Sequence, residues 1–173
     1  GSDVKLVYTG LHGTGAVSVP EALREFGFEN IYEVDEQAVP DGNFSTVKSP
    51  NPEEADALEM AIRLAEKIGA DLVMGTDPDA DRVGLAVPGV DGKMVLLNGN
   101  ETGVLLCDYV LRNGRADGSK FDSSDFIAST VVTTPLLINL AQAYGVGHRE
   151  TLTGFKYIGA AISEEKRNYI VGG

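Results

Sequence analysis

The sequence is poor in cysteine and in positive charge, and it has no long apolar run. Cys107 is its only cysteine, so no intrachain disulfide can form and a reducing compartment is favoured. The 14 Lys and Arg residues face 26 Asp and Glu residues, and the net charge of −12 argues against nucleic acid or an anionic membrane surface as a partner. Because no apolar stretch reaches transmembrane length and no signal-peptide pattern is found, we expect a soluble cytoplasmic protein.

Short apolar runs alternate with helical patterns along the 173 residues. This alternation predicts an α/β fold with two consecutive units, residues 1–98 and residues 99–173. A proline-bearing loop over residues 35–52 precedes a helix over residues 53–68, whose apolar side chains share one face. The remaining predictions are strands at 4–8, 31–34, 71–74, 83–87, 94–97, 126–132, 148–152 and from 169, and helices at 98–111, 135–144 and 155–166.

Three carboxylates stand at every second position directly after the apolar run that ends at Met74. Asp77, Asp79 and Asp81 would repel one another in so short a loop unless a cation or several hydrogen-bond donors offset their charge. Oxygen ligands alone favour Mg²⁺, Mn²⁺ or Ca²⁺ over zinc. Arg82 adds a fork that suits phosphate. The pattern therefore predicts phosphoryl-transfer chemistry at the carboxyl end of a strand.

Three other interpretations of this loop compete. An EF-hand would need glycine at its sixth position and glutamate at its twelfth, where this chain has Arg82 and Pro88. An acidic surface turn is common, but the preceding apolar strand and the following arginine disfavour it here. A phosphatase of the haloacid dehalogenase type would place a nucleophilic aspartate directly after the strand and follow it with D-x-T/V, and Asp81 before Arg82 has the wrong offset for this.

Residues 75–82, GTDPDADR, resemble the metal-binding loop of the α-D-phosphohexomutases, the phosphoglucomutase and phosphomannomutase superfamily, whose general pattern is D-G-D-G/A-D-R. Pro78 stands where glycine is more usual. Together with PNPEE at 50–54 and TLTGFK at 151–156, this variant resembles the phosphoglucomutase and phosphopentomutase branch. The resemblance covers essentially the whole chain. It implies two consecutive three-layer-type α/β units with mixed sheets, namely domain two and a C-terminally truncated domain three of a four-domain enzyme.

The resemblance also implies an activity. Enzymes of this superfamily interconvert 1-phospho and 6-phospho sugars through a phosphoserine and a bisphosphorylated intermediate. Glucose 1-phosphate and 6-phosphate are the favoured substrates, and mannose or pentose phosphates are the alternatives. Asp77, Asp79 and Asp81 would each give one oxygen to Mg²⁺, and Arg82 would neutralise the phosphoryl group in transfer. The family's serine-bearing T-A-S-H-N-P loop has no counterpart, since Ser49 lies in a different family segment, so we expect the isolated chain to be inactive without the missing domains of the same polypeptide.

The loop before the helix predicted at 155–166 is the candidate sugar-binding loop, because the resembled family uses this loop near the sugar. Backbone N–H groups and an ammonium at a helix start can receive an anionic ligand. Helix capping is an alternative role for Thr153 and Gly154, and core packing for Phe155, whereas Lys156 is favoured as a ligand contact. Thr133, which follows another predicted strand, is a weaker candidate with capping as its alternative.

Residues 10–15, GLHGTG, lie between the first predicted strand and a helical pattern. Their spacing fits neither the dinucleotide-binding fingerprint nor the P-loop, so they are interpreted as a tight turn. His12 is a weaker candidate for a place in the active cleft, with a packing or capping role favoured.

A non-catalytic metal-binding or regulatory α/β module is the alternative from another functional class. An apolar strand that stops at Gly172 and Gly173 without a capping element is typical of a truncation and disfavours this alternative. In the resembled family, a strand at this place continues into a G-E-E-S sugar-recognition loop. Its glutamates would distinguish one sugar from another.

Overall fold

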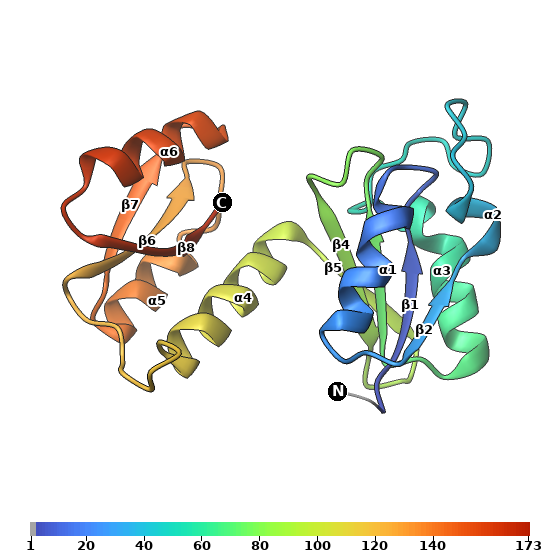
Figure 1. The fold of residues 1–173 in the computed structure, drawn as a ribbon, viewed down its shortest axis with the longest axis horizontal. Coiled ribbons are helices and arrows are strands. Elements are labelled where there is room, and N and C mark those ends of the chain that lie inside the picture. The colour runs from blue at the N-terminus through green and yellow to red at the C-terminus, as the bar shows by residue number, and fades with distance from the viewer. Residues whose placement is uncertain (1–2) are drawn as a thin grey trace. The chain divides into compact units, whose positions relative to one another are not determined.

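The computed structural model describes residues 3–173, and contacts between backbone segments divide the chain into two compact units. The division falls between Gly99 and Asn100. Each unit combines a sheet with helices, and Figure 1 labels the elements in chain order. None of the helices in the described residues is long and apolar enough to cross a membrane.

The first unit contains a five-stranded mixed sheet with the strand order β2-β1-β3-β4-β5. The three strands β1, β2 and β3 are parallel, and β1 and β3 contribute Val7 and Val73 to the core. Strand β4 runs antiparallel to both of its neighbours. The short loop of residues 77–82 connects it to β3, and a tight turn with Gly92 at φ +78° connects it to β5. The bounds are Lys5–Thr9 (β1), Asn30–Glu33 (β2), Leu72–Thr76 (β3), Val83–Pro88 (β4) and Met94–Leu97 (β5).

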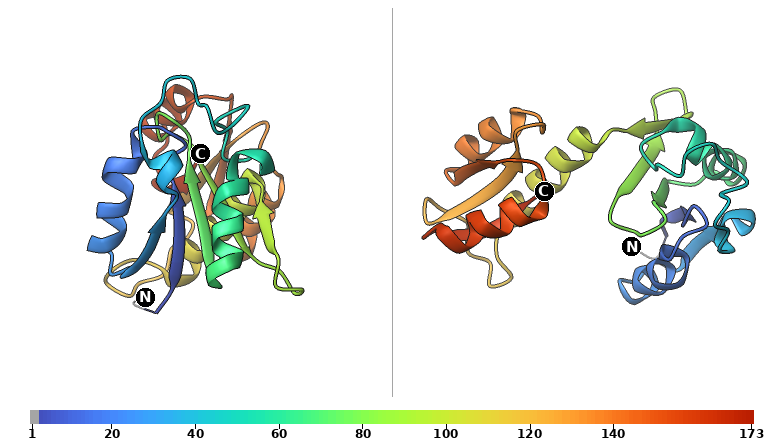
Figure 2. Two further views of the ribbon diagram at one scale, coloured as in Figure 1. Left: turned by 90° about the vertical axis from the view of Figure 1, so that its right-hand side faces the viewer. Right: turned by 90° about the horizontal axis from the view of Figure 1, so that it is seen from above.

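Helices cover both faces of this sheet. Figure 2 shows α1 (Gly15–Glu25) and α3 (Ala55–Ile68) on opposite sides. Helix α3 buries the small and branched side chains of one face against Val7 and Val73 of the sheet, and Gly69 ends it in the left-handed conformation that lets a helix close without steric strain.

The second unit contains the three-stranded sheet β7-β6-β8, in which both strand pairs are parallel. Helices α4 and α5 bury side chains against Ile127 on one face, and α6 packs against Phe126 and Ala128 on the other. The bounds are Gly99–Asn113 (α4), Asp125–Thr130 (β6), Leu136–Tyr144 (α5), Gly147–Thr151 (β7), Phe155–Glu164 (α6) and Asn168–Gly172 (β8).

The prediction of consecutive α/β units is confirmed, but the second sheet is parallel where a mixed sheet was expected. Helix α5 connects β6 to β7 and helix α6 connects β7 to β8, so each strand starts again from the same end of the sheet. A helix also interrupts the loop predicted at 35–52, because α2 (Asp35–Ala38) turns there and buries Gln37. Cys107 lies in the core beside Leu111, as expected of a small apolar residue.

Candidate functional site

The three aspartates lie in residues 77–82, here called the aspartate loop, which connects β3 to β4 at the carboxyl end of β3. Thr76 of β3 pairs with Val83 of β4, and this is the last pair between the two strands before the loop. Inside the loop, the amide of Ala80 donates to the carbonyl of Asp77 at 3.0 Å. Ala80 has φ +60°, a left-handed conformation that is costly for a residue with a Cβ atom. The loop is therefore a tight turn and not an extension of the strand.

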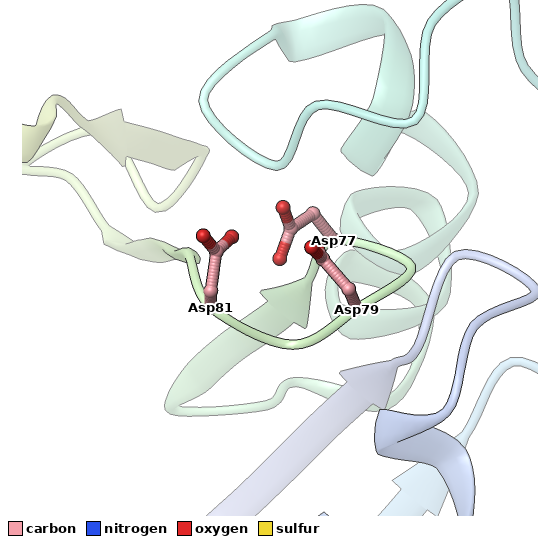
Figure 3. Close-up of side chains that lie close together, drawn as sticks. All are labelled: Asp77, Asp79 and Asp81. Atoms are coloured by element: carbon pink, nitrogen blue, oxygen red, sulfur yellow. The ribbon is translucent and has the colours of Figure 1, made fainter.

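The carboxylates of Asp77, Asp79 and Asp81 converge, as Figure 3 shows. One oxygen from each lies within 4.8 Å of the others. Asp77 is 1% exposed, whereas Asp79 and Asp81 are exposed to solvent. Three oxygen ligands at this spacing, with an open side toward water, fit a hard divalent cation that keeps part of its hydration shell. The donor set thus agrees with the metal site predicted from the sequence.

Arg82 fixes the buried aspartate through two of its groups. Its amide donates to Oδ1 of Asp77 at 2.9 Å, and its Nε donates to Oδ2 at 2.9 Å. Asp81 lies farther from the guanidinium, with Oδ1 at 3.8 Å from Nε. Arg82 thus forms a salt bridge with Asp77, which orients the guanidinium beside the three carboxylates.

The electrostatics of the loop follow from these contacts. Burial raises the pKa of Asp77, but hydrogen bonds from the Arg82 amide and guanidinium, and from Asp81, outweigh burial and leave that pKa below its usual value. The hydrogen bond to Asp77 is the largest cause of the raised pKa of Asp81, followed by burial and by the nearby charges of Asp79 and Asp77. The hydrogen bond to Asp77 also raises the pKa of Arg82, which stays charged. The metal-free loop therefore holds Asp77 as an anion and disfavours ionisation of Asp81.

The candidate sugar-binding residues lie together after β7, where α6 begins. All four residues are exposed: Thr153, Gly154, Phe155 and Lys156. Because the Phe155 side chain is 76% exposed, the alternative that it packs in the core is wrong. Gly154 has φ +124°, which only glycine adopts readily. The ammonium of Lys156 lies 4.8 Å from the ring centroid of Tyr157. The loop thus presents an apolar ring and a cation to solvent.

The two weaker candidates have partners within the chain. The ring nitrogens of His12 lie 2.9 Å from the carbonyl of Val39 and 2.8 Å from Oγ1 of Thr46. The hydroxyl of Thr133 bonds Oγ1 of Thr130 at 3.0 Å and receives the Thr130 amide at 3.3 Å, as in a capped turn. The contacts of His12 match the packing alternative. The Thr133 hydroxyl turns back to Thr130, and no side chain caps α5, so helix capping by Thr133 is not observed.

One residue near the site was missed from the sequence. Thr14 donates its amide to the carbonyl of Pro78 at 2.9 Å and its hydroxyl to the same oxygen at 3.2 Å. A threonine in a glycine turn 64 residues away along the chain gives no signal of this contact by itself. The glycines on either side of it are the only hint that another backbone approaches closely.

The two units match two successive domains of one enzyme family. Residues 1–91 match the family model described as phosphoglucomutase/phosphomannomutase, alpha/beta/alpha domain II. Residues 98–173 match the model of alpha/beta/alpha domain III. Together the two matches cover almost the whole chain.

Curated relatives carry the same family name. The phosphoglucomutase of Staphylococcus epidermidis (strain ATCC 12228 / FDA PCI 1200) is 39% identical over 173 residues, which are 99% of this chain and 31% of the relative. The phosphoglucomutase of Staphylococcus aureus (strain N315) is 40% identical over 163 residues, which are 94% of this chain and 29% of the relative. The chain thus spans about a third of the length of these relatives.

Solved structures share the fold. A phosphoglucomutase/phosphomannomutase family protein of Burkholderia thailandensis gives a TM-score of 0.72 at 22% identity, covering 96% of this chain and 34% of that one. The N-acetylphosphoglucosamine mutase of Aspergillus fumigatus, in complex with GlcNAc-6P and magnesium, gives a TM-score of 0.62 at 15% identity, covering 98% of this chain and 35% of that one. With both family models matched in order, the chain belongs to the phosphoglucomutase/phosphomannomutase family.

Proposed function

We propose that this chain forms the metal-binding and sugar-binding middle part of a cytoplasmic phosphoglucomutase, which interconverts glucose 1-phosphate and glucose 6-phosphate. The observation that carries the proposal is the convergence of three carboxylates beside an arginine at the carboxyl end of β3. An acidic turn without a function would gain nothing from this arrangement, because the carboxylates repel one another. Family membership adds that such proteins generally use a metal cofactor and act on sugar phosphates.

Asp77, Asp79 and Asp81 would hold Mg²⁺, each through one carboxylate oxygen. A bound Mg²⁺ would supply positive charge that stabilises the phosphoryl oxygens during transfer. The burial of Asp77 and its two bonds to Arg82 make it the fixed ligand, whereas the exposed Asp79 and Asp81 can adjust to the cation. Magnesium is favoured over zinc because all three donors are oxygens.

Arg82 would bind the phosphoryl group next to the cation. Its amide and Nε are engaged by Asp77, and the guanidinium is half-exposed, so its outer edge faces solvent, where an anion can approach. Phosphoryl transfer depends mainly on positioning and on charge stabilisation, and a preoriented guanidinium supplies both. In this proposal the reacting serine comes from another domain of the same polypeptide, and the chain alone has no turnover.

The loop with Thr153, Gly154, Phe155 and Lys156 would contact the sugar phosphate. Its exposed backbone at the start of α6 and the Lys156 ammonium suit an anionic ligand, and the exposed Phe155 ring suits the apolar face of a sugar. Glucose phosphates are proposed because both curated relatives are named phosphoglucomutases. Mannose and pentose phosphates are the alternatives, and assays of the full-length protein on all three would separate them.

Mn²⁺ titration of isotope-labelled protein tests the metal site directly, because the paramagnetic ion broadens the signals of nearby amides. We expect broadening at low Mn²⁺ to be confined to residues 75–83. Asp79→Asn removes one proposed ligand and should weaken binding about tenfold or more. The matched control is Asp91→Asn in the exposed turn between β4 and β5, which should bind like the wild type. Diffuse broadening over the acidic surface, unchanged in Asp79→Asn, would overturn the proposed site.

A coupled assay tests the proposed lack of turnover. The chain, supplied with glucose 1-phosphate, glucose 1,6-bisphosphate, Mg²⁺ and glucose-6-phosphate dehydrogenase, should form no glucose 6-phosphate above the background. Full-length family enzyme under the same conditions is the positive control. Turnover by the chain alone would contradict the assignment of the reacting serine to another domain.

A further inference from the structure

The glycine turn, residues 10–15, packs directly on the aspartate loop although it holds none of the proposed ligands. Thr14 gives two hydrogen bonds to the carbonyl of Pro78, from its amide at 2.9 Å and from its hydroxyl at 3.2 Å. A Cβ atom at Gly13 would overlap the backbone of Pro78, so only glycine permits this approach. Pro78 lies between Asp77 and Asp79, and its position therefore sets the direction of both side chains.

The same turn supports the residue before Asp77. The hydroxyls of Tyr8 and Thr76 form a buried hydrogen bond of 2.8 Å at the end of β3. A Cβ atom at Gly15 would lie 2.5 Å from the Tyr8 hydroxyl and would also overlap Oγ1 of Thr76. The two residues on either side of Asp77 are thus both packed against glycines of the turn.

His12 connects the turn to α2 and to the segment that follows it. Its amide donates to the carbonyl of Gln37 at 2.9 Å, and its Nδ1 can only donate to the carbonyl of Val39, since a carbonyl is an acceptor. In the neutral ring, Nε2 is then the acceptor for the Thr46 hydroxyl, which in turn receives Nε2 of Gln37 at 3.1 Å. Every polar group in this chain of contacts has a partner, as a rigid support requires.

We propose that the glycine turn is a positioning support for the aspartate loop, and that Thr14 is its positioning residue. This role rests on the proposed function, and it is given to a turn whose spacing fits neither the dinucleotide-binding fingerprint nor the P-loop. Ala80 holds an unfavourable left-handed conformation, and such backbone strain persists only where the surroundings fix it. The contacts of Gly13 and Thr14 with Pro78 supply that constraint two residues before Ala80. His12 becomes part of the support and not a ligand for the substrate.

The first test needs no metal. Hydrogen exchange of the Ala80 and Arg82 amides reports the loop geometry, because both amides bond to Asp77. Gly13→Ala should displace Pro78 and increase exchange at these two amides about tenfold. Gly42→Ala is the matched control, since a Cβ atom there meets nothing within 4 Å and exchange should not change. Equal exchange rates at both amides in the two variants, with both proteins folded, would overturn the proposal.

The second test uses Thr14, whose substitutions are milder than a new Cβ atom. Thr14→Val removes only the hydroxyl and should weaken Mn²⁺ binding about threefold to tenfold, as expected for one hydrogen bond. Thr14→Ser keeps the hydroxyl and should restore wild-type affinity. A residue that merely stabilises the fold would lower the melting temperature in both variants without changing the Mn²⁺ midpoint. Equal Mn²⁺ affinity in Thr14→Val and wild type would exclude a positioning role for the hydroxyl.

The two readouts separate this inference from the proposed function. If wild-type protein binds no Mn²⁺ at the loop but Gly13→Ala still increases exchange at Ala80, the support exists and the metal site is wrong. If wild-type protein binds Mn²⁺ and the Gly13 and Thr14 variants change neither readout, the metal site stands and the support is wrong.

Discussion

Asp125→Ala should destabilise the second unit more than any surface substitution. Asp125 begins β6 and is 1% exposed. Nη2 of Arg115 donates to both of its carboxylate oxygens at 2.6 Å. The amide of Asp122 donates at 2.9 Å and Nδ2 of Asn168 at 3.3 Å. One buried carboxylate thus connects the loop after α4, the start of β6 and the start of β8.

The loss of stability depends on which member of the Asp125–Arg115 ion pair is left buried without its partner. Removing one member of a buried ion pair costs about 3–5 kcal/mol. The Arg115 side chain is 33% exposed and keeps its bond to the carbonyl of Lys120 at 2.7 Å, so Asp125→Ala should cost about 3 kcal/mol, at the low end. Arg115→Ala leaves the buried carboxylate without its cation and should cost about 4 kcal/mol. The double variant should cost less than the sum by about 1–2 kcal/mol, because both single changes break one interaction.

Denaturant unfolding followed by amide signals of the second unit measures these free energies without interference from the first. In a unit of this size, 3 kcal/mol corresponds to a fall in melting temperature of more than about 10 °C. Arg112→Ala is the control, since it breaks an exposed pair with Asp108 one helical turn away and should leave stability unchanged. Single substitutions at Asp125 and Arg115 that each cost less than about 1 kcal/mol, or that add without coupling, would refute the reasoning.

Asp81→Asn should weaken Mn²⁺ binding about tenfold without lowering the melting temperature of the metal-free protein, because the fold raises the pKa of Asp81 and so disfavours its ionised form. Calorimetry measures both quantities. Hydrogen bonds from the Ser45 hydroxyl and from the Asn43 and Ser45 amides lower the pKa of Asp41 to about 2. The stability that Asp41 contributes is therefore present above its unfolded value of 3.8 and lost as the pH falls toward 2. Ser45→Ala should shift the carboxyl NMR titration upward. Leu58→Ala, at a fully buried position of α3, should cost about 2–5 kcal/mol in denaturant unfolding.

The sequence was most informative where a pattern is local. The alternation of carboxylates in residues 77–81 predicted that their side chains converge, since side chains two residues apart meet readily in a short turn. The strands and the main helices were predicted within a few residues, because apolar periodicity is set by burial. The helix predicted from residue 53 begins at Ala55, since the backbone before it forms a turn in which the amide of Glu54 donates to the carbonyl of Asn51.

The features that depend on distant partners were missed. Helix α2 exists inside a predicted loop because the buried Gln37 finds Thr9 and Thr46 as partners, 28 and 9 residues away. The hydrophobic periodicity of the sequence does not predict such a contact. The parallel second sheet was missed for another reason. The mixed sheet expected for the second unit came from the family resemblance, whereas helices connect its strands and make them parallel.

The sequence presents Asp77, Asp79 and Asp81 as equivalent, and the structure separates them. Asp77 is buried and bound twice by Arg82, so its orientation is set before any cation arrives. The hydrogen bond to Asp77 is the main cause of the raised pKa of Asp81, followed by burial and by the negative charges of Asp79 and Asp77. A cation bound between the three carboxylates would offset the repulsion between their charges. Because Arg82 binds Asp77, the residue proposed to bind the phosphoryl group also orients one of the proposed metal ligands. A change at Arg82 should therefore alter metal affinity as well as anion binding.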